Sequence, residues 1–334
     1  MPSRRLFTAL LAAAAVAVGG AGTATAAKPK PHRPVPKPSP TRGVVLVKTN
    51  LALENASAAG TGIVLTKTGE ILTNNHVIRG ATTINVVVPA THRTYSASVV
   101  GYDIADDIAL IKVSGAPKLA TVTRGDSSKL KIGQFVRAVG NANGGGKLVQ
   151  TTGSITGLQK TIQVQNEDGE VTQLANLISM NARIVPGDSG GPLLDSKGRV
   201  IGVDAAGSAN TGVTADGYAI PINKAYGLVK LMRAGSASTL VHIGKTAFLG
   251  ISVNVTRDGL TVANIVPGGA AETAGLPLNS LLTTIDGVNV ASLQDVRTAL
   301  FQHHPGDVIA VGYVDPVSAL PGTVQLTLGD GPPQ

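Results

Sequence analysis

A serine in a glycine-rich turn is the feature that most limits how this chain can fold. The segment Pro186–Leu193 reads Pro-Gly-Asp-Ser-Gly-Gly-Pro-Leu and lies between runs of β-forming residues. Glycines near Ser189 leave its hydroxyl exposed and free the surrounding N–H groups to point at one place. This geometry suits a nucleophile beside an oxyanion hole, the N–H donors that stabilise a tetrahedral intermediate. A plain turn explains the same residues, so the turn alone decides nothing.

The same residues also fit Gly-x-Ser-x-Gly, the nucleophile elbow of α/β-hydrolases. That motif requires a helix directly after the serine and a partner histidine further downstream. Here Pro192 follows, and a polar turn at 195–198 leads into a strand-like run at 200–203. The downstream histidines (His242, His303 and His304) lie in a region that fits a separate domain. The succession of strand, hairpin and strand therefore favours an all-β fold.

Two upstream segments supply the partners that such a serine needs. An apolar run ends at two asparagines and delivers His76, and Asp107 opens an alternating β-type run at 108–113. The order His76, Asp107, Ser189 is that of chymotrypsin-like enzymes, not of subtilisins or α/β-hydrolases. A lone histidine is more often structural, and an Asp-Asp pair at a strand start is usually a solvated cap. Together, the three segments indicate a general base (His76), its orienting carboxylate (Asp107) and a nucleophile (Ser189).

These segments resemble the catalytic motifs of the HtrA/DegP serine proteases. The matching stretches are 72–78, 107–110 and 187–193, and 217–221 is similar to the segment that closes that family's second barrel. The resemblance extends from about residue 43 to the C-terminus. It selects Asp107 over Asp106, because the aspartate directly before Ile-Ala-Leu matches the family's catalytic one. It also implies that the oxyanion hole is formed by the N–H groups of Gly187 and Ser189.

Residues 43–235 read as many short strands rich in Val, Ile and Thr, with turn residues between them. Two groups of about six strands predict two six-stranded antiparallel barrels, an all-β, chymotrypsin-like double barrel. The histidine and aspartate fall in the first group and the serine in the second, so the site is expected in the crevice between the barrels. A helix is expected from Asn223 to about Arg233, followed by a hinge at 234–239.

A second pattern begins near residue 246 and resembles an α+β PDZ domain of the HtrA type, expected over residues 246–330. Strands alternate with a short helix after Pro267 and a longer helix capped by Ser292. The family's usual Gly-Asp after Ala-Gly-Leu is replaced by Leu278–Ser280, which leaves the loop details open.

The start of this second domain carries its expected binding loop. By resemblance, backbone amides there receive the terminal carboxylate of a peptide that adds as a strand. An apolar–Gly–apolar tetrapeptide is by itself an ordinary strand start, so only the surrounding motifs favour the binding role. The loop residues are Phe248, Leu249, Gly250 and Ile251.

The N-terminus predicts export. Two arginines, an apolar stretch over 6–18 and an Ala-x-Ala sequence at Ala24 and Ala26 are the three regions of a secretory signal peptide, residues 1–27. An uncleaved membrane anchor is the alternative, although the apolar part is short for a spanning helix. Residues 28–42 form a proline- and lysine-rich linker, expected to be extended. The expected location is secreted or in the cell envelope.

The charge of the chain lies mainly in this leader. Of 28 Lys and Arg, seven precede residue 43, which leaves 21 against 20 acidic residues in the rest. With no tryptophan and nine Phe plus Tyr, a nucleic-acid partner is not expected. The absence of cysteine excludes disulfides and thiolate metal sites. No metal or cofactor motif is found in the sequence, so neither a metal nor a cofactor is expected.

The chain departs from its relatives near the serine. Asp188 stands where the family commonly has asparagine. In trypsin-like zymogens an aspartate there pairs with a new N-terminus, but Arg42–Val45 is at best a distant activation sequence. A surface exchange of asparagine for aspartate, tolerated without a functional role, is the favoured interpretation. The resemblance also places the specificity pocket near Arg183, Asp204 and Ala205. Arg183 either reaches that pocket and favours acidic side chains, or points outward and leaves a preference for small aliphatic ones.

The expected function is that of an exported serine endopeptidase that hydrolyses unfolded or damaged proteins through an acyl-enzyme. Its expected partners are unfolded protein and peptide substrates, peptide C-termini at the PDZ domain and, by resemblance, further copies of itself in a trimer or larger homo-oligomer. The alternative is a protease in a resting or inactive state that acts mainly as a peptide-binding or chaperone module.

Overall fold

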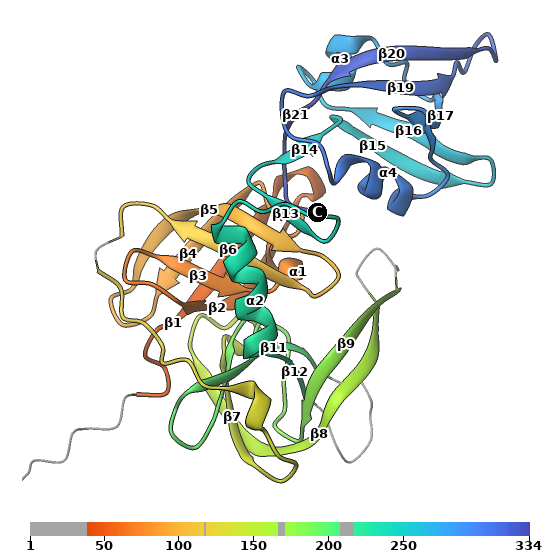
Figure 1. The fold of residues 1–334 in the computed structure, drawn as a ribbon. Coiled ribbons are helices and arrows are strands. Elements are labelled where there is room, and N and C mark those ends of the chain that lie inside the picture. Colours follow the sequence, from red (N-terminus) through yellow and green to blue (C-terminus); the bar gives the residue numbers. More distant parts are fainter. Residues whose placement is uncertain (1–38, 117, 166–170, 208–216) are drawn as a thin grey trace, which may run out of the picture. The chain divides into compact units, whose positions relative to one another are not determined.

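The structure, a computed structural model, describes residues 39–116, 118–165, 171–207 and 217–334. The predicted signal peptide and most of the predicted linker lie outside these residues. Figure 1 shows the described helices and strands in chain order. Within the described ranges, no helix has the length and apolar character needed to cross a membrane.

The first group of strands forms a seven-stranded antiparallel sheet. Its order is β13-β5-β4-β1-β2-β3-β6, and β5 also pairs with β6. The strands are β1 (Val44–Leu51), β2 (Ala56–Val64), β3 (Glu70–Thr73), β4 (Thr83–Val88), β5 (Arg93–Asp103), β6 (Ile108–Val113) and β13 (Val241–Ile243). Fully buried aliphatic side chains such as Val47, Ile71 and Ile111 form its core. The short helix α1 (Asn75–Ile78) follows β3 directly.

The second group of strands closes into a six-stranded barrel, as predicted for this half of the double barrel. The order around the barrel is β10-β11-β12-β9-β8-β7. The strands are β7 (Phe135–Gly140), β8 (Val149–Gln165), β9 (Val171–Met180), β10 (Pro192–Leu194), β11 (Val200–Gly207) and β12 (Gly217–Pro221). Strand β8 is 17 residues long. Register shifts between Ile155 and Ile162 let it stay paired with β9 over this length.

Helix α2 (Ile222–Arg233) connects the two strand groups (Figure 1). It contacts β5, β6 and β13 of the sheet and β11 and β12 of the barrel. Its buried face follows helical spacing, with Ile222, Ala225, Val229 and Met232. These residues belong to a core shared by both groups. The predicted helix is confirmed, with its start one residue earlier.

Residues after β13 form an α+β domain with its own core. Its main sheet has the order β15-β16-β17-β19-β20, with β18 paired to β17, and β14 pairs separately with β21. Helix α4 begins with the predicted Ser292 cap, completed by Asp295 as a capping box. The strands are β14 (Thr246–Phe248), β15 (Ile251–Thr256), β16 (Gly259–Ile265), β17 (Leu281–Ile285), β18 (Val288–Asn289), β19 (Val308–Val314), β20 (Pro321–Thr327) and β21 (Gly329–Gly331), and the helices are α3 (Ala270–Ala274) and α4 (Leu293–Leu300).

Candidate active site

His76 and Asp107 are in direct contact. The imidazole Nδ1 of His76 lies 2.8 Å from Asp107 Oδ2, and the backbone N–H of His76 donates to Asp107 Oδ1 at 2.9 Å. The aspartate side chain is 9% exposed and the histidine side chain 41% exposed. A carboxylate held by both groups fixes the position of the ring and favours the tautomer with a proton on Nδ1, which leaves Nε2 able to accept a proton.

The turn before β6 explains why Asp107, and not Asp106, reaches the imidazole. Asp107 has a φ of 52°, a left-handed conformation that turns the chain sharply, and its carbonyl accepts a hydrogen bond from Asn74 Nδ2 at 2.8 Å. Asp106 points elsewhere and pairs with Lys224 at 2.5 Å.

The segment between β9 and β10, here called the serine loop because it carries Ser189, is attached to the first sheet through strand β2. The backbone N–H of Thr61 donates to the carbonyl of Ser189 at 2.8 Å. A Cβ on the neighbouring Gly60 would lie 2.6 Å from a methyl of Val77 and 3.2 Å from the Ser189 carbonyl oxygen. The helix that carries His76 and the loop that carries Ser189 therefore both approach the space that a side chain at residue 60 would fill.

The hydroxyl of Ser189 has one hydrogen-bond partner among the described residues. It donates to the carbonyl of Ala205 on β11 at 3.4 Å. The structure thus brings His76 together with Asp107 and brings Ser189 to the same junction between sheet and barrel.

The peptide groups before Ser189 have defined orientations. The carbonyl of Pro186 accepts from the N–H of Asn143, 2.6 Å away, in the short helix η3 (Ala142–Gly144). A trans peptide points its C=O and N–H in opposite directions, so the N–H of Gly187 faces away from this loop. In the described part of the chain, the N–H groups of Gly187 and Ser189 have no acceptor. Gly187 needs its glycine identity, because its φ is 92° and a Cβ would lie 2.3 Å from the Asn141 carbonyl oxygen.

Two carboxyls near Ser189 are buried: Asp188, which is 5% exposed and therefore no surface residue, and Asp204 on β11. Burial raises the pKa of Asp188, whose Oδ2 accepts from the N–H of Val185 at 3.0 Å. Asp204 is fully buried, and within the described residues neither of its carboxyl oxygens has a hydrogen-bond partner. Burial, and secondarily the nearby Asp188, raises the pKa of Asp204 well above its usual value. Within the possible activation sequence Arg42–Val45, Val44 and Val45 belong to strand β1.

The residues expected near a specificity pocket differ in exposure. Arg183 is exposed between the buried Ala182 and Ile184, and its carbonyl accepts from Thr151 Oγ1 at 2.9 Å. The Asp204 side chain is inaccessible, whereas the carbonyl of Ala205 meets the Ser189 hydroxyl. Ile184 lies near two glycines at strand ends. A Cβ on Gly207 would lie 2.2 Å from its carbonyl oxygen, and a Cβ on Gly217 would lie 2.7 Å from its Cγ1. These contacts do not indicate that a substrate pocket here would prefer acidic side chains.

The predicted carboxylate loop of the C-terminal domain has open amides. The carbonyls of Leu249 and Gly250 accept from Ala271 at 3.0 Å and from Val266 at 2.8 Å. In the described ranges, no acceptor is present for the N–H groups of Leu249 and Gly250. Phe248 ends β14 and Ile251 begins β15, so a turn with two free donors lies at a strand end.

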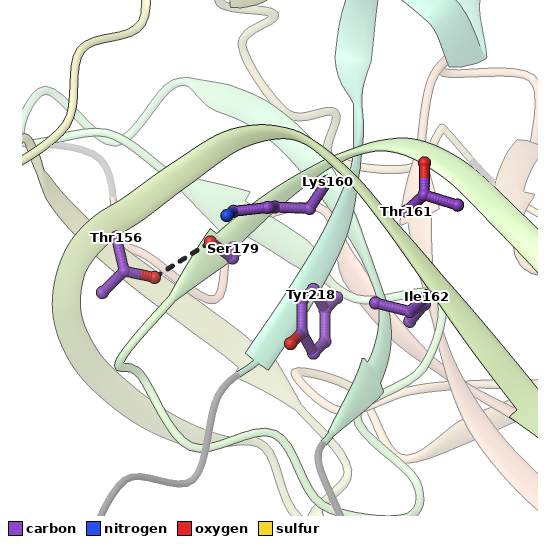
Figure 2. A pocket seen from close by; sticks show the side chains of 6 residues that line it. All are labelled: Thr156, Lys160, Thr161, Ile162, Ser179 and Tyr218. Carbon is purple, nitrogen blue, oxygen red and sulfur yellow. Dashed lines mark hydrogen bonds between the residues drawn. The ribbon is translucent and has the colours of Figure 1, made fainter.

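A separate polar cavity of about 390 Å³ lies on β8, β9 and β12. In Figure 2 the side chain of Lys160 extends across it beside the hydrogen-bonded hydroxyls of Thr156 and Ser179, 3.0 Å apart. None of the three candidate catalytic residues lines this cavity. No group of three or more His, Cys, Asp or Glu suited to a metal ion occurs among the described residues.

Sequence reasoning missed the threonines that join the two halves of the site. The carbonyl of Thr61 accepts from Thr73 Oγ1 at 2.8 Å, and both residues are completely buried. The available signal was Gly60-Thr61-Gly62, a polar residue between two glycines inside a strand. Glycine in a strand often marks a close approach of another backbone.

Comparison with known proteins agrees with this geometry. Residues 60–203 match a trypsin-like peptidase domain and residues 247–314 match a PDZ domain. The serine protease PepD of Mycobacterium tuberculosis is 33% identical over 306 residues, which cover 86% of this chain and 63% of PepD. The chain thus spans less than two thirds of that relative.

A shorter relative and a solved structure extend the match over most of their own length. The serine protease Do-like HtrA of Lactococcus lactis subsp. cremoris is 30% identical, with 77% of this chain and 68% of the relative covered. The HtrA-type protease AlgW with a tripeptide is 26% identical with a TM-score of 0.51, covering 88% of this chain and 95% of AlgW. With a peptidase domain followed by a PDZ domain, the chain belongs to the HtrA/Do family of serine proteases.

Proposed function

We propose that this protein is an exported serine endopeptidase that hydrolyses unfolded or damaged proteins. In this proposal the Oγ of Ser189 attacks the scissile carbonyl while Nε2 of His76 takes its proton, and the proton then passes to the leaving amine. Water hydrolyses the acyl-enzyme with the same base. Asp107 orients the imidazole and stabilises the imidazolium.

The contact between His76 Nδ1 and Asp107 Oδ2 carries this proposal. It joins the histidine and the aspartate that family membership points to, across 31 residues, and the aspartate is almost buried. A buried carboxylate that accepts two hydrogen bonds from one histidine is well suited to hold that histidine in position as a general base.

The serine loop supports a preformed oxyanion hole at Gly187 and Ser189. If the Pro186 carbonyl turned inward, it would fill the place of the developing oxyanion, but the N–H of Asn143 holds that carbonyl outward. Preorganised donors of this kind contribute strongly to acyl transfer, and loss of one costs about 10²–10³ in kcat.

The C-terminal PDZ domain is proposed to bind peptide C-termini. Two open amides at Leu249 and Gly250 suit a carboxylate, and the adjacent strand β15 suits a peptide added as a strand. A cell-envelope location and a homo-oligomeric assembly belong to the same proposal. They draw on relatives named as periplasmic proteases and on the resemblance to the family.

One observation favours the alternative, a resting protease that acts mainly as a peptide-binding module. The Ser189 hydroxyl donates its proton to the Ala205 carbonyl, and in the proposed mechanism this proton must be redirected to His76. A rotation about one side-chain bond is fast in solution, so the endopeptidase proposal is preferred.

The deciding experiment is intact-mass labelling of the mature protein with a fluorophosphonate, with and without unfolded casein. An adduct mapped to Ser189 without casein supports a competent protease, and labelling only with casein supports activation by substrate. The Ser189→Ala variant is the control and should stay unlabelled. No labelling in either condition, with peptide still bound, would establish the binding-module alternative.

A further inference from the structure

Thr61 lies at the junction between the first sheet and the barrel and has hydrogen bonds to both. It lies in β2, its residue is 0% exposed, and it is flanked by Gly60 and Gly62. Every polar atom of this residue has a partner, and three of the four partners lie outside the first sheet. A polar side chain in such a buried place is retained only where its hydrogen bonds are satisfied.

The hydroxyl of Thr61 bridges two loops of the second barrel. It donates to the carbonyl of Gly187 at 2.7 Å and accepts from the backbone N–H of Asn141 at 2.9 Å. A hydroxyl has one proton to donate and lone pairs to accept, so both contacts are made at once. Asn141 opens the loop whose Asn143 N–H holds the Pro186 carbonyl.

The backbone of Thr61 holds the other side of the same site. Its N–H donates to the Ser189 carbonyl at 2.8 Å, and its carbonyl accepts from the hydroxyl of Thr73 at 2.8 Å. Thr73 is the last residue of β3, three positions before His76. One residue therefore connects the strand that leads to the histidine with both ends of the Gly187–Ser189 segment.

The Gly187 carbonyl matters because it sets the orientation of its peptide group. With this oxygen held by Thr61, the opposite N–H of the same peptide, that of Asp188, donates to the Val185 carbonyl at 3.0 Å. The Pro186 carbonyl is held separately by Asn143. The peptide groups Pro186–Gly187 and Gly187–Asp188 are thus fixed. The next one, Asp188–Ser189, is held by the N–H of Gly191, which donates to the Asp188 carbonyl at 2.9 Å.

We propose that Thr61 is a positioning residue for the oxyanion hole, acting through its hydroxyl on Gly187 and Asn141 without touching substrate. The inference rests on the proposed endopeptidase function and deepens it. The position requires a hydroxyl in addition to the backbone contact between the sheet and the barrel. An apolar side chain of the same shape would leave the buried Gly187 carbonyl and the buried Asn141 N–H without this partner.

The test compares three variants of the full mature chain. Thr61→Val removes the hydroxyl while keeping the branched shape, and Thr61→Ser keeps the hydroxyl. Thr246→Val is the matched control, because the hydroxyl of Thr246 is similarly buried (2% exposed) and bonds Tyr102 Oη at 3.2 Å, away from the serine loop.

The expected signature is a loss of kcat and of the rate of fluorophosphonate labelling in Thr61→Val. Both should fall on the order of tenfold to a hundredfold, the scale on which a displaced catalytic group acts, with KM little changed. Thr61→Ser should restore most of both rates. Thr246→Val should match the loss in melting temperature without the loss in rate.

Hydrogen exchange of the folded variants reads out the positioning directly. The amides of Asn141 and Asp188 should exchange faster in Thr61→Val and not in Thr61→Ser or Thr246→Val. Unchanged exchange together with wild-type kcat in Thr61→Val would overturn the proposal. A wild-type protein that neither cleaves casein nor labels would contradict the proposed function, and the exchange pattern would still decide whether Thr61 positions the loop.

Discussion

The aspartate beside His76 does two things that a neutral amide cannot do together. It accepts from both the ring Nδ1 and the backbone N–H of the histidine. Asp107→Asn should therefore present an N–H₂ donor to the ring, favour the other tautomer and lower kcat by about 10⁴ with a nearly unchanged KM. Steady-state hydrolysis of a peptide substrate measures this.

The matched control is the neighbouring carboxylate. Asp106 pairs with Lys224 and has no contact with the imidazole among the described residues, so Asp106→Asn should retain kcat within about twofold. Equal losses in the two variants would mean that the orienting carboxylate has been wrongly assigned.

Asp204 gives the stability of the protein a defined pH dependence. Its usual pKa is 3.8, and burial raises it well above that value in the folded protein. Above about pH 4 the folded state therefore binds more protons than the unfolded state, so the free energy of unfolding falls as pH rises towards the raised pKa. Asp204→Asn removes this loss and should raise the melting temperature at pH 7, by at least about 2 °C, with little gain at pH 4.

A buried aspartate with partners should respond in the opposite direction. Asp195 accepts from the N–H groups of Lys197 and Arg199 at 2.9 Å and pairs with the Arg199 guanidinium at 2.7 Å. Asp195→Asn should lower the melting temperature at pH 7. Thermal melts across pH 4 to 8 would contradict the role of burial if both variants changed stability in the same direction.

At the scale of elements, the contact between β2, β3 and the serine loop depends on a glycine. Gly190 has a φ of 82°, and a Cβ there would lie 2.1 Å from the Thr61 carbonyl oxygen and 2.2 Å from Thr73 Oγ1. Gly190→Ala should therefore push the loop off the first sheet. We expect kcat to fall on the order of a hundredfold, with a lower melting temperature.

Gly198 separates backbone strain from the effect of this contact. It has a similar φ of 74° in the turn after β10, but a Cβ there meets nothing within 4 Å. Gly198→Ala should cost about 1–2 kcal/mol of stability for the left-handed conformation and leave kcat unchanged. If Gly190→Ala lost stability alone, the loop would not depend on this contact for its catalytic geometry.

Periodic and capped elements were predictable from the sequence, whereas contacts between distant elements were not. Helix α2 follows from its apolar spacing and α4 from the Ser292 cap. The full length of β8 could not be predicted, because its irregular stretch between Ile155 and Ile162 stays in the strand only through shifts in its pairing with β9. For the site, residue types and order predicted that His76 and Asp107 lie together, and the structure pairs them. The glycines beside Thr61 mark a close backbone approach but not its partners at Gly187 and Asn141, and the burial of Asp204 has no local signal.

At the scale of the whole molecule, the last residues of the sequence connect the C-terminal domain to the helix that carries His76. Strand β21 pairs with β14, next to the predicted carboxylate loop. Beyond it, the Pro333 carbonyl accepts from the N–H of Gly80 at 2.8 Å, and the Gln334 carbonyl accepts from Asn75 Nδ2 at 2.9 Å. These two bonds hold the start and the end of the α1 turn.

Deleting residues 332–334 should therefore loosen α1 while leaving the β14–β21 pairing in place. We expect faster hydrogen exchange at the Gly80 amide, because it loses its acceptor, and a several-fold lower kcat, because His76 lies within this helix. Asp330→Asn, which removes an exposed ion pair with Lys245 in the same segment, is the control and should change neither. Unchanged exchange at Gly80 after the deletion would mean that α1 is held by the first sheet alone, and that the C-terminal domain has no mechanical path to the histidine through this segment.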